Sequence, residues 1–348
     1  MPIVAQDVDA VLGIDTHRDT HQVELTSPLG VKLAQIEVPN SSTGFTQLGE
    51  FIARHSPGPR LIAGVEGTRS YGIGISRFLT RTGIVVVEVD RPERKSRRGK
   101  GKSDDIDAHL AAVSVLGMTT DRLPQPRADG DREALRILLV ARQEMTTTNT
   151  GQTNRLRALL LAGGDTDRDL ARGRLTTARL LTLARRRQPL NATREQAVRH
   201  GEIRRLATSL RQNQQTLRDN KAQLTAIVDD LAPTLIARPG LGPVTAAQIL
   251  LSWSHPGRVR DEAAFAMLAG TCPLPASSGQ TVRHRLNRGG DRALNRAIHT
   301  IALTRWRCDP RTHTYIAHRR AQGKSDREIR RCLKRYITRE LYRALATP

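Results

Sequence analysis

The stretch that decides the fold is Val11-Leu12-Gly13-Ile14-Asp15, a short apolar run that ends in an acidic residue. A second run of the same kind, Leu61-Ile62-Ala63-Gly64-Val65-Glu66, follows later in the chain. Short apolar runs between polar segments are typical of strands buried in a sheet. We therefore expect two central strands, each with a carboxylate at its carboxyl end.

The segments around these two strands predict the rest of a mixed sheet. Asn40 or Ser41 has the side chain of a helix N-cap, and residues 84–89 are apolar enough for a strand buried on both faces. The expected strands lie at residues 11–15, 22–26, 31–38, 60–65 and 84–89, and the expected helices at 40–55, 70–82 and around Asp104 and Asp107. This order matches an RNase H-like, resolvase-like α/β domain, in which a five-stranded sheet has helices on both faces.

Four acidic residues are candidate metal ligands and catalytic residues: Asp15, Glu66, Asp104 and Asp107. The last two are three residues apart, so on a helix they share a face. An RNase H-like fold would bring all four together, and carboxylates repel one another unless a cation lies between them. Oxygen ligands of this kind suit Mg²⁺ or Mn²⁺. Taken singly, Asp104 would also serve as a helix cap and Asp107 as a first-turn acid.

The charge of the chain indicates the substrate. Among 348 residues there are 56 Lys and Arg against 34 Asp and Glu, a net charge of +22. Such a surface attracts polyanions, so the natural substrate of the acidic quartet is a phosphodiester, and paired cations can clamp its attacking and leaving oxygens. A merely arginine-rich or ribosomal-type protein would have the same charge but would leave the acidic residues unexplained.

Cysteine use and hydropathy favour a cytoplasmic protein. The three cysteines, Cys272, Cys308 and Cys332, are widely spaced and form no C-x-x-C pair, so neither a disulfide framework nor a zinc site is predicted. The first residues lack the basic start and apolar core of a signal peptide. No apolar run is long enough to cross a bilayer.

A heptad repeat marks the end of a helical region at 131–232. Apolar residues recur every seven positions at Ile203, Leu210, Leu217, Leu224 and Leu231. A second set lies three residues after each of the first four: Leu206, Asn213, Asn220 and Ile227. Four heptads of this kind predict a coiled coil. Asn at the second set favours a parallel seam between chains, and hence a homo-oligomer. The alternatives are an antiparallel hairpin with a helix near 133–162 and an amphipathic helix that packs on its own protein.

The last region, 233–348, is mainly helical and strongly basic. Residues 283–348 carry 18 Lys or Arg against 5 Asp or Glu. The Gly-rich segment 238–246 opens a helix and looks like the hairpin of a helix-hairpin-helix element, whose backbone N–H groups can hold a phosphate. We therefore expect three domains, at 1–130, 131–232 and 233–348.

A loop before the basic helices, Pro273-Leu274-Pro275-Ala276-Ser277-Ser278-Gly279-Gln280, holds two serines. A serine hydroxyl can attack phosphorus and form a phosphoserine–DNA ester, which conserves bond energy for rejoining. Ser-Ser-Gly is also common loop chemistry, so its spacing alone does not distinguish a nucleophile.

Taken together, these segments resemble the DEDD transposases of bacterial insertion sequences, a family of bridge-RNA-guided recombinases. The resemblance is carried by Gly13-Ile14-Asp15-Thr16-His17, Val65-Glu66-Gly67-Thr68, Lys102-Ser103-Asp104-Asp105-Ile106-Asp107-Ala108, Pro239-Gly240-Leu241-Gly242-Pro243, and Leu268-Ala269-Gly270-Thr271-Cys272-Pro273 with Ser278-Gly279 and Arg288-Gly289-Gly290-Asp291. Ser103 stands where the family often has Thr.

What the resemblance implies is a resolvase-like domain, a coiled-coil insert and a C-terminal transposase domain in a bacterial, nucleoid-associated protein. It assigns metal binding to Asp15, Glu66, Asp104 and Asp107, and the nucleophile to the serine before glycine, Ser278, with Ser277 as its neighbour and competitor. It also implies element-end and target DNA as partners, a structured guide RNA, and a dimer or dimer of dimers. A metal-dependent junction-resolving endonuclease that uses water is the alternative function.

Overall fold

The computed structural model describes residues 2–89, 104–188, 190–276 and 284–346, without the side chains of residues 104 and 105. The chain forms two compact units. The first comprises Met1–Glu133, Leu250–Ile298 and Arg319–Pro348, and the second comprises Ala134–Ile249 and His299–His318. The last third of the chain thus contributes to both units. The domain boundaries expected at 130 and 232 come from changes in composition along the chain, and they stay a prediction.

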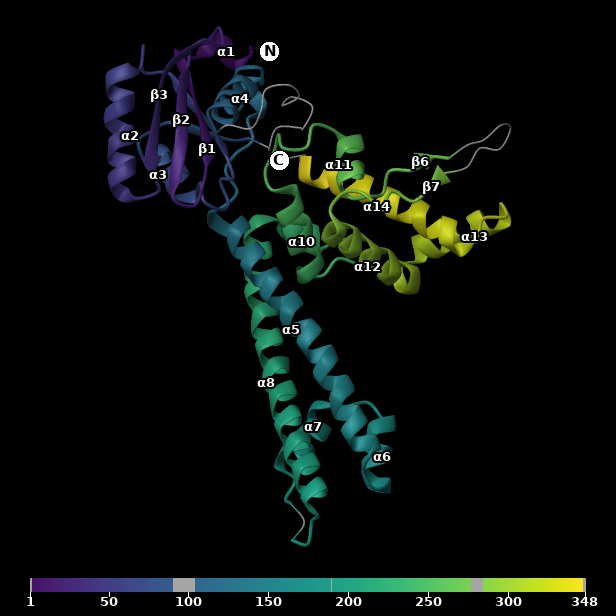
Figure 1. The fold of residues 1–348 in the computed structure, drawn as a ribbon. Helices are drawn as coiled ribbons and strands as arrows, with labels where there is room; N and C mark the ends of the chain where they lie inside the picture. The colour runs from purple at the N-terminus through teal and green to yellow at the C-terminus, as the bar shows by residue number, and fades with distance from the viewer. Residues whose placement is uncertain (1, 90–103, 189, 277–283, 347–348) are drawn as a thin grey trace. The chain divides into compact units, whose positions relative to one another are not determined.

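A mixed five-stranded sheet forms the centre of the N-terminal part of the first unit (Figure 1). Its strands are β1 (Ala10–Thr16), β2 (Thr20–Thr26), β3 (Lys32–Pro39), β4 (Leu61–Glu66) and β5 (Val85–Val89), in the order β3-β2-β1-β4-β5. The β1–β2 and β2–β3 pairs are antiparallel, and β4 lies parallel to both β1 and β5. The expected mixed sheet is therefore confirmed, each strand lying within two residues of its expected position.

Helices cover both faces of this sheet. Alternate residues of the strands, among them Leu12, Ile14 and Val65, pack with apolar residues of α2 (Ser42–His55) and α3 (Ile73–Arg81). The other face packs on α4 (Asp104–Leu116) and the short α1 (Val4–Asp7). Helix α2 begins where the sequence predicts, because the Ser41 hydroxyl accepts a hydrogen bond from the Gly44 N–H at 3.3 Å.

The contact of α4 with the sheet is unusually close at two glycines. A Cβ added to Gly13 of β1 would overlap the carbonyl oxygen of Ala108 and lie 2.7 Å from the backbone N of Ala112. On β4, a Cβ at Gly64 would lie 2.7 Å from a methyl of Val115. Both strands therefore lack a side chain where the helix backbone crosses them, and this fixes the distance of α4 from the sheet.

Two long helices dominate the second unit, α5 (Gly130–Leu161) and α8 (Arg194–Leu231). They run antiparallel and side by side (Figure 1), because Leu138 is bonded to Asn220 near one end and Ala162 to Arg199 near the other. Between them in sequence lie α6 (Asp165–Arg172) and α7 (Thr177–Arg185). Leucines of α5 and α7 form one apolar core with Ile203, Leu206 and Leu210 of α8.

The partner of the heptad seam is therefore in the same chain. The amide of Asn220 donates to the carbonyl of Leu138 at 2.9 Å, and Arg142 donates to Asn220 Oδ1 at 3.3 Å and to the Leu217 carbonyl at 2.9 Å. An Asn that bonds the backbone of α5 does not need an Asn from a second chain. Of the two seams considered, the structure has the intrachain antiparallel hairpin, and homo-oligomer formation stays a prediction.

The remaining helices follow the expected order. They are α9 (Pro233–Ile236), α10 (Pro243–Trp253), α11 (Glu262–Leu268), α12 (Arg292–Cys308), α13 (Pro310–Ala321) and α14 (Asp326–Ala346), with a two-stranded ribbon of β6 (Leu274–Pro275) and β7 (His284–Arg285) after α11. In the first unit, Trp253, Phe265 and Tyr342 pack ring against ring. The sequence predicted a loop, and not a ribbon, at β6.

The Gly-rich turn before α10 is a tight one. Gly240 has a φ of +78°, and the Leu241 N–H donates to the Arg238 carbonyl at 3.2 Å. Such a backbone conformation favours glycine. The nearly buried Arg305 donates to the Pro239 carbonyl at 2.7 Å, which ties the turn to α12 within the second unit. None of the helices in the described ranges is long and apolar enough to cross a membrane.

Candidate active site

Asp15 and Glu66 lie near the carboxyl ends of two neighbouring strands of the sheet, β1 and β4. Ile14 pairs with Val65 in the parallel β1–β4 register, so the next residues of the two strands are the two acids. Ile14 and Val65 belong to the core beneath α2 and α3. Because side chains alternate along a strand, Asp15 and Glu66 both belong to the face that α4 covers. Asp15 is 6% exposed there, and the Thr16 hydroxyl donates to the Glu66 carbonyl at 2.7 Å.

Helix α4 brings Asp107 to this face. The residue after it, Ala108, is the one whose carbonyl oxygen meets Gly13, two positions before Asp15 on β1. Asp107 is itself 7% exposed. The helix begins at Asp104, whose side chain lies outside the described residues. The structure thus places Asp15, Glu66 and Asp107 on one side of the sheet, at adjacent strand ends and on the helix that crosses them.

Three polar residues of β2 on this face were not singled out from the sequence. Gln22 pairs with Asp15 across β1 and β2. Glu24 accepts a hydrogen bond from the Thr26 hydroxyl at 3.0 Å and pairs with His109 of α4 at 2.6 Å. All three β2 residues are buried. The alternation Gln22, Glu24, Thr26 within a buried strand was the signal, because it puts these three polar residues on one face. His17 Nε2 lies 3.8 Å from Asp15 Oδ2.

The donor set matches a hard divalent cation, since carboxylate oxygens are the ligands that Mg²⁺ and Mn²⁺ favour. Two of the acids are more than nine-tenths buried, and a buried carboxylate is costly without a cation or donors. Among the described side chains, however, no three His, Cys, Asp or Glu are close enough to form a metal cage. The fourth predicted ligand, Asp104, is not among those side chains.

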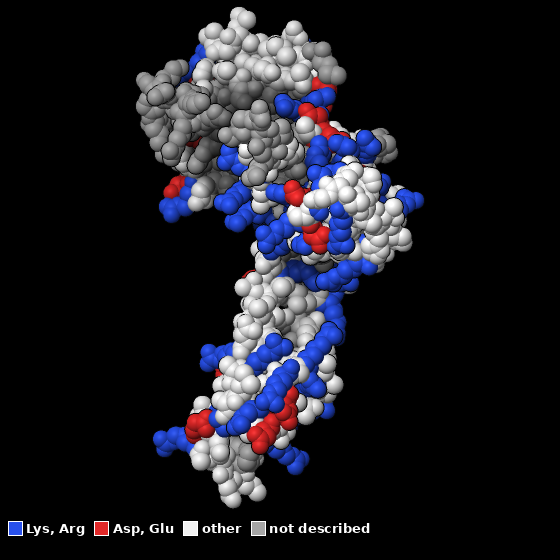
Figure 2. All heavy atoms as spheres, turned by 90° about the vertical axis from the view of Figure 1, so that its right-hand side faces the viewer, with Lys and Arg blue, Asp and Glu red and all other residues white. Residues whose placement is uncertain are grey.

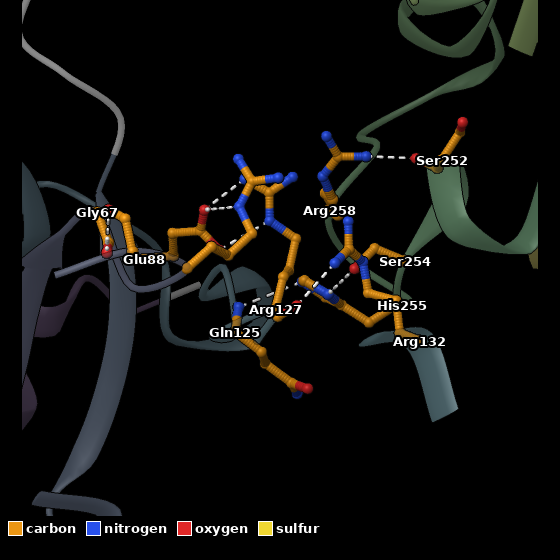
Figure 3. A network of polar contacts seen from close by, with 11 residues as sticks. Gly67, Glu88, Gln125, Arg127, Arg132, Ser252, Ser254, His255 and Arg258 are labelled. Carbon is orange, nitrogen blue, oxygen red and sulfur yellow. Dashed lines mark hydrogen bonds and ion pairs between the residues drawn. The ribbon is translucent and has the colours of Figure 1, made fainter. Parts of the chain in front are cut away.

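A second cluster surrounds Glu88 of β5, which the sequence did not connect to the quartet (Figure 3). Arg127 donates to both carboxylate oxygens of Glu88, and Arg69 lies 3.5 Å away. Burial by itself would raise the pKa of Glu88, but the hydrogen bonds of Arg127 and the charges of Arg127 and Arg69 hold that pKa below its ordinary value. Glu88 is therefore an anchor for arginines.

The same cluster carries an excess of positive charge. Burial, followed by repulsion from Arg127, Arg69 and Arg258, lowers the pKa of Arg132 to about 10. Burial, followed by the charges of Arg258, Arg127 and Arg132, lowers the pKa of His255. The neutral imidazole that results accepts a hydrogen bond at Nε2 from the Gln125 N–H at 3.2 Å.

The serine loop is bracketed by the ribbon. Leu274 pairs with Arg285 and Pro275 with His284, so β6 and β7 hold the two ends of the loop together. Ser277 and Ser278 lie outside the described residues. Positive charge is prominent on the molecular surface, and Figure 2 shows Lys and Arg side chains outnumbering Asp and Glu on the face it presents.

Comparisons with known proteins agree with this architecture. Residues 12–163 match a family model of the DEDD type described as a transposase, and residues 232–317 match the model described as the transposase IS116/IS110/IS902 family. The insertion element IS110 uncharacterized 43.6 kDa protein of Streptomyces coelicolor is 25% identical, over 92% of this chain and 90% of its own length. The putative transposase y4pF/y4sB of Sinorhizobium fredii is 23% identical, over 84% of this chain and 71% of its own.

Both family models describe transposases, so the class that the comparisons define is a DNA-processing enzyme of a mobile element. The chain belongs to the DEDD transposases of the IS110 family, to which the two models and the Streptomyces relative point together. Its substrate is accordingly DNA, and its biological setting is the transposition of an insertion sequence.

Proposed function

We propose that this transposase excises and inserts its element by site-specific recombination, with Asp15, Glu66, Asp104 and Asp107 as metal ligands and Ser278 as nucleophile. The observation that supports the proposal is that Asp15 and Glu66 end neighbouring strands, while Asp107 lies on α4, the helix that packs on the same face of the mixed sheet. Asp104 is one helical turn before Ala108, which favours the same face.

In this proposal the acids hold and orient a scissile phosphate. Divalent Mg²⁺ or Mn²⁺, when bound by the four carboxylates, supplies electrostatic stabilisation of a phosphodiester. The chain's own contribution is rigidity: Gly13 and Gly64 let α4 pack against the strand ends, and burial of Asp15 and Asp107 excludes water from the ligands. The Glu24–His109 pair joins β2 to α4 beside the acids and is a positioning contact.

Ser278 supplies the covalent step. Its hydroxyl oxygen forms a bond to phosphorus, the bond from phosphorus to the leaving strand's oxygen breaks, and the hydroxyl proton is lost to a base or to solvent. The phosphoserine ester keeps the energy of the broken bond, so a second strand end can attack it and regenerate the serine. The β6–β7 ribbon supports this role because it pins both ends of the serine loop.

A structured guide RNA completes the proposed assembly. In guided systems base pairing reads sequence while the protein reads backbone and shape, and a net charge of +22 suits two nucleic acids. Sequencing RNA that copurifies with the protein from cells carrying the whole element tests this part. A single non-coding RNA able to pair with donor and target DNA is expected, whereas a random RNA pool would contradict it.

Trapping a covalent adduct tests the chemistry. The protein is incubated with DNA carrying the element's ends, with its copurified RNA and Mg²⁺, then denatured and analysed for DNA that stays attached. We expect an adduct that is lost in Ser278→Ala and kept in Ser277→Ala. Cleavage that persists in Ser278→Ala with no adduct would instead identify a metal-dependent junction-resolving endonuclease that uses water.

Mixing two inactive variants tests whether the acids and the serine act across subunits of a homo-oligomer. Protein with only Asp15→Ala is combined with protein with only Ser278→Ala. Recovered recombination is expected if each subunit lends one half of the site. Inactivity in verified mixed assemblies would show that both halves must come from one chain.

A further inference from the structure

A pocket of about 710 Å³ lies in the first unit, beside the β6–β7 ribbon. We call it the C-terminal pocket. Its walls come from Gly270–Pro273, from His284–Asn287 and from residues between 319 and 339, which belong to α13, α14 and the turn between them. The ribbon that holds the ends of the serine loop is thus one wall of this pocket, and helix α14 is another.

The lining is strongly cationic. Five arginines and two lysines line the pocket, against one carboxylate, Glu328, among the described residues. Glu328 is already engaged, since it accepts hydrogen bonds from the N–H and hydroxyl of Ser325 at 2.9 and 2.7 Å. Outside the lining, Glu262 pairs with Arg335 at 2.8 Å and Arg339 at 3.0 Å. Two carboxylates therefore face seven cations, an excess that suits a polyanion.

Lys334 shows the charge imbalance most clearly. Its ammonium donates to Asn295 Oδ1 at 2.7 Å, and that amide is neutral. Asn295 is held in turn, because its Nδ2 donates to the Ala269 carbonyl at 2.6 Å. Burial lowers the pKa of Lys334. A half-buried ammonium with an amide partner gains stabilisation when an anion enters the pocket.

An exposed aromatic ring accompanies the cations. Tyr336 lines the pocket and is 52% exposed, although aromatic residues make up only 3% of the chain. The guanidinium of Arg339 lies 5.9 Å from the centre of its ring. Aromatic faces beside cationic grooves are the arrangement with which proteins bind single-stranded nucleic acid, because the ring stacks on a base while the cations hold phosphates.

We propose that the C-terminal pocket binds an unpaired stretch of DNA strand, with its phosphates on the arginines and lysines and a base against Tyr336. A pocket of this volume is the size of a small-ligand site, and a base inside an intact duplex is stacked on its neighbours and must leave the helix to meet a side chain. The inference rests on the proposed function in one respect, which is that the bound strand is DNA. It gives the pocket beside the β6–β7 ribbon a preference for DNA whose strands are separated.

Binding measurements on the full-length Ser278→Ala protein test the preference without strand chemistry. Fluorescence anisotropy compares a labelled thymidine oligonucleotide, its duplex with adenosine, and the uridine RNA of the same length. We expect the unpaired DNA to bind most tightly and Tyr336→Ala to weaken it about tenfold while leaving duplex affinity nearly unchanged. Tyr336→Phe, which keeps the ring, should restore binding.

A matched pair of charge variants separates the pocket from the general surface. Arg331 lines the pocket and Arg327 does not, although both are exposed residues of α14. Arg331→Gln should weaken binding of the unpaired DNA more than Arg327→Gln does. Equal losses from the two variants would mean that net charge alone binds the strand, and would overturn the proposal.

The three cysteines give a readout on the unsubstituted pocket. Cys272 and Cys332 line it, whereas the exposed Cys308 of α12 does not. Their rates of alkylation by iodoacetamide are followed by mass spectrometry with and without saturating oligonucleotide. Unpaired DNA should slow Cys272 and Cys332 by about tenfold or more and leave Cys308 unchanged, since stacked strand occupies the pocket.

Three results would overturn the inference. The first is that oligonucleotide slows alkylation of Cys308 as much as that of Cys272 and Cys332. The second is that saturating oligonucleotide does not slow alkylation of Cys272 and Cys332. The third is that the RNA or the duplex slows their alkylation more than the unpaired DNA does. Failure of the adduct experiment would leave this binding intact, because Ser278 is already removed here. Loss of the binding preference would equally leave the adduct chemistry standing.

Discussion

Gly13 of β1 lies against the carbonyl oxygen of Ala108 on α4, with no room for a side chain between them. This contact sets the height of α4 above the sheet and, with it, the position of Asp107, which precedes Ala108. The spacing of the acidic residues is therefore fixed by a residue that carries no chemistry of its own.

Replacing Gly13 by Ala should displace α4. We expect a loss of about 1–3 kcal/mol in the free energy of unfolding, the usual cost of overpacking a core, together with a loss of transposition activity. Urea denaturation followed by circular dichroism measures the first. Gly151→Ala is the control, because Gly151 is in α5 with nothing near its Cβ position, and it should gain about 0.5–1 kcal/mol from helix propensity. Equal stability of Gly13→Ala and the parent would contradict the close contact.

The quartet should make stability depend on Mg²⁺. Ligand that binds only the folded state stabilises it, by about 2.7 kcal/mol at a hundredfold excess over the dissociation constant. Asp15→Asn and Asp107→Asn should lose most of the Mg²⁺-induced rise in unfolding temperature.

Asp19→Asn is the matched control for those variants. Asp19 is an exposed acid in the β1–β2 turn, paired with its neighbour Arg18 at 2.9 Å. It should keep the full response to Mg²⁺. A response that is the same in all four proteins would place the ion elsewhere.

Glu88 should contribute stability that disappears in acid. Its folded pKa lies below the ordinary value of 4.5, so the unfolded chain binds the proton more readily and stability falls as pH drops below 4.5 towards the folded pKa. Glu88→Gln leaves Arg127 buried without its anion and should cost about 3 kcal/mol at pH 7. The variant's unfolding free energy should vary less with pH below 4.5 than the parent's. Identical slopes for the two proteins would show that Glu88 does not titrate in this range.

The helical hairpin can be tested at two positions of one heptad series. Asn220→Ala removes a buried amide that bonds the Leu138 carbonyl and Arg142, and should cost about 1–3 kcal/mol. Asn213→Ala should cost less, because its amide lies 3.5 Å from Gln152 and is less buried. The difference should be independent of protein concentration in thermal unfolding. A cost that grows on dilution would indicate a seam between chains.

Much of the sheet and the placement of three acids could be predicted from the sequence. Apolar runs ending in Asp15 and Glu66 define strands and their ends, and alternation within each strand assigns the faces. Ser41 was one of two predicted caps for α2, and it is the cap observed. These are local patterns, so neighbouring residues are enough to determine them.

Other features depended on which distant segment a residue meets. The heptad of α8 specifies an apolar face with two asparagines. The partner of that face is α5, because α6 and α7 connect the two long helices so that they pack antiparallel. The arginines around Glu88 and those of the C-terminal pocket are scattered in a chain with 56 basic residues, so nothing local distinguishes them.

By itself the sequence determined the strands, the helical character of the central region and the strand ends that carry Asp15 and Glu66, because periodicity and capping act over a few residues. The tertiary structure decided that α8 pairs within its own chain, that α4 packs closely on Gly13, and that Tyr336 shares a pocket with Arg285 of the β6–β7 ribbon. Each of these depends on packing between segments far apart in the chain, where shape and burial select one partner among many of similar chemistry.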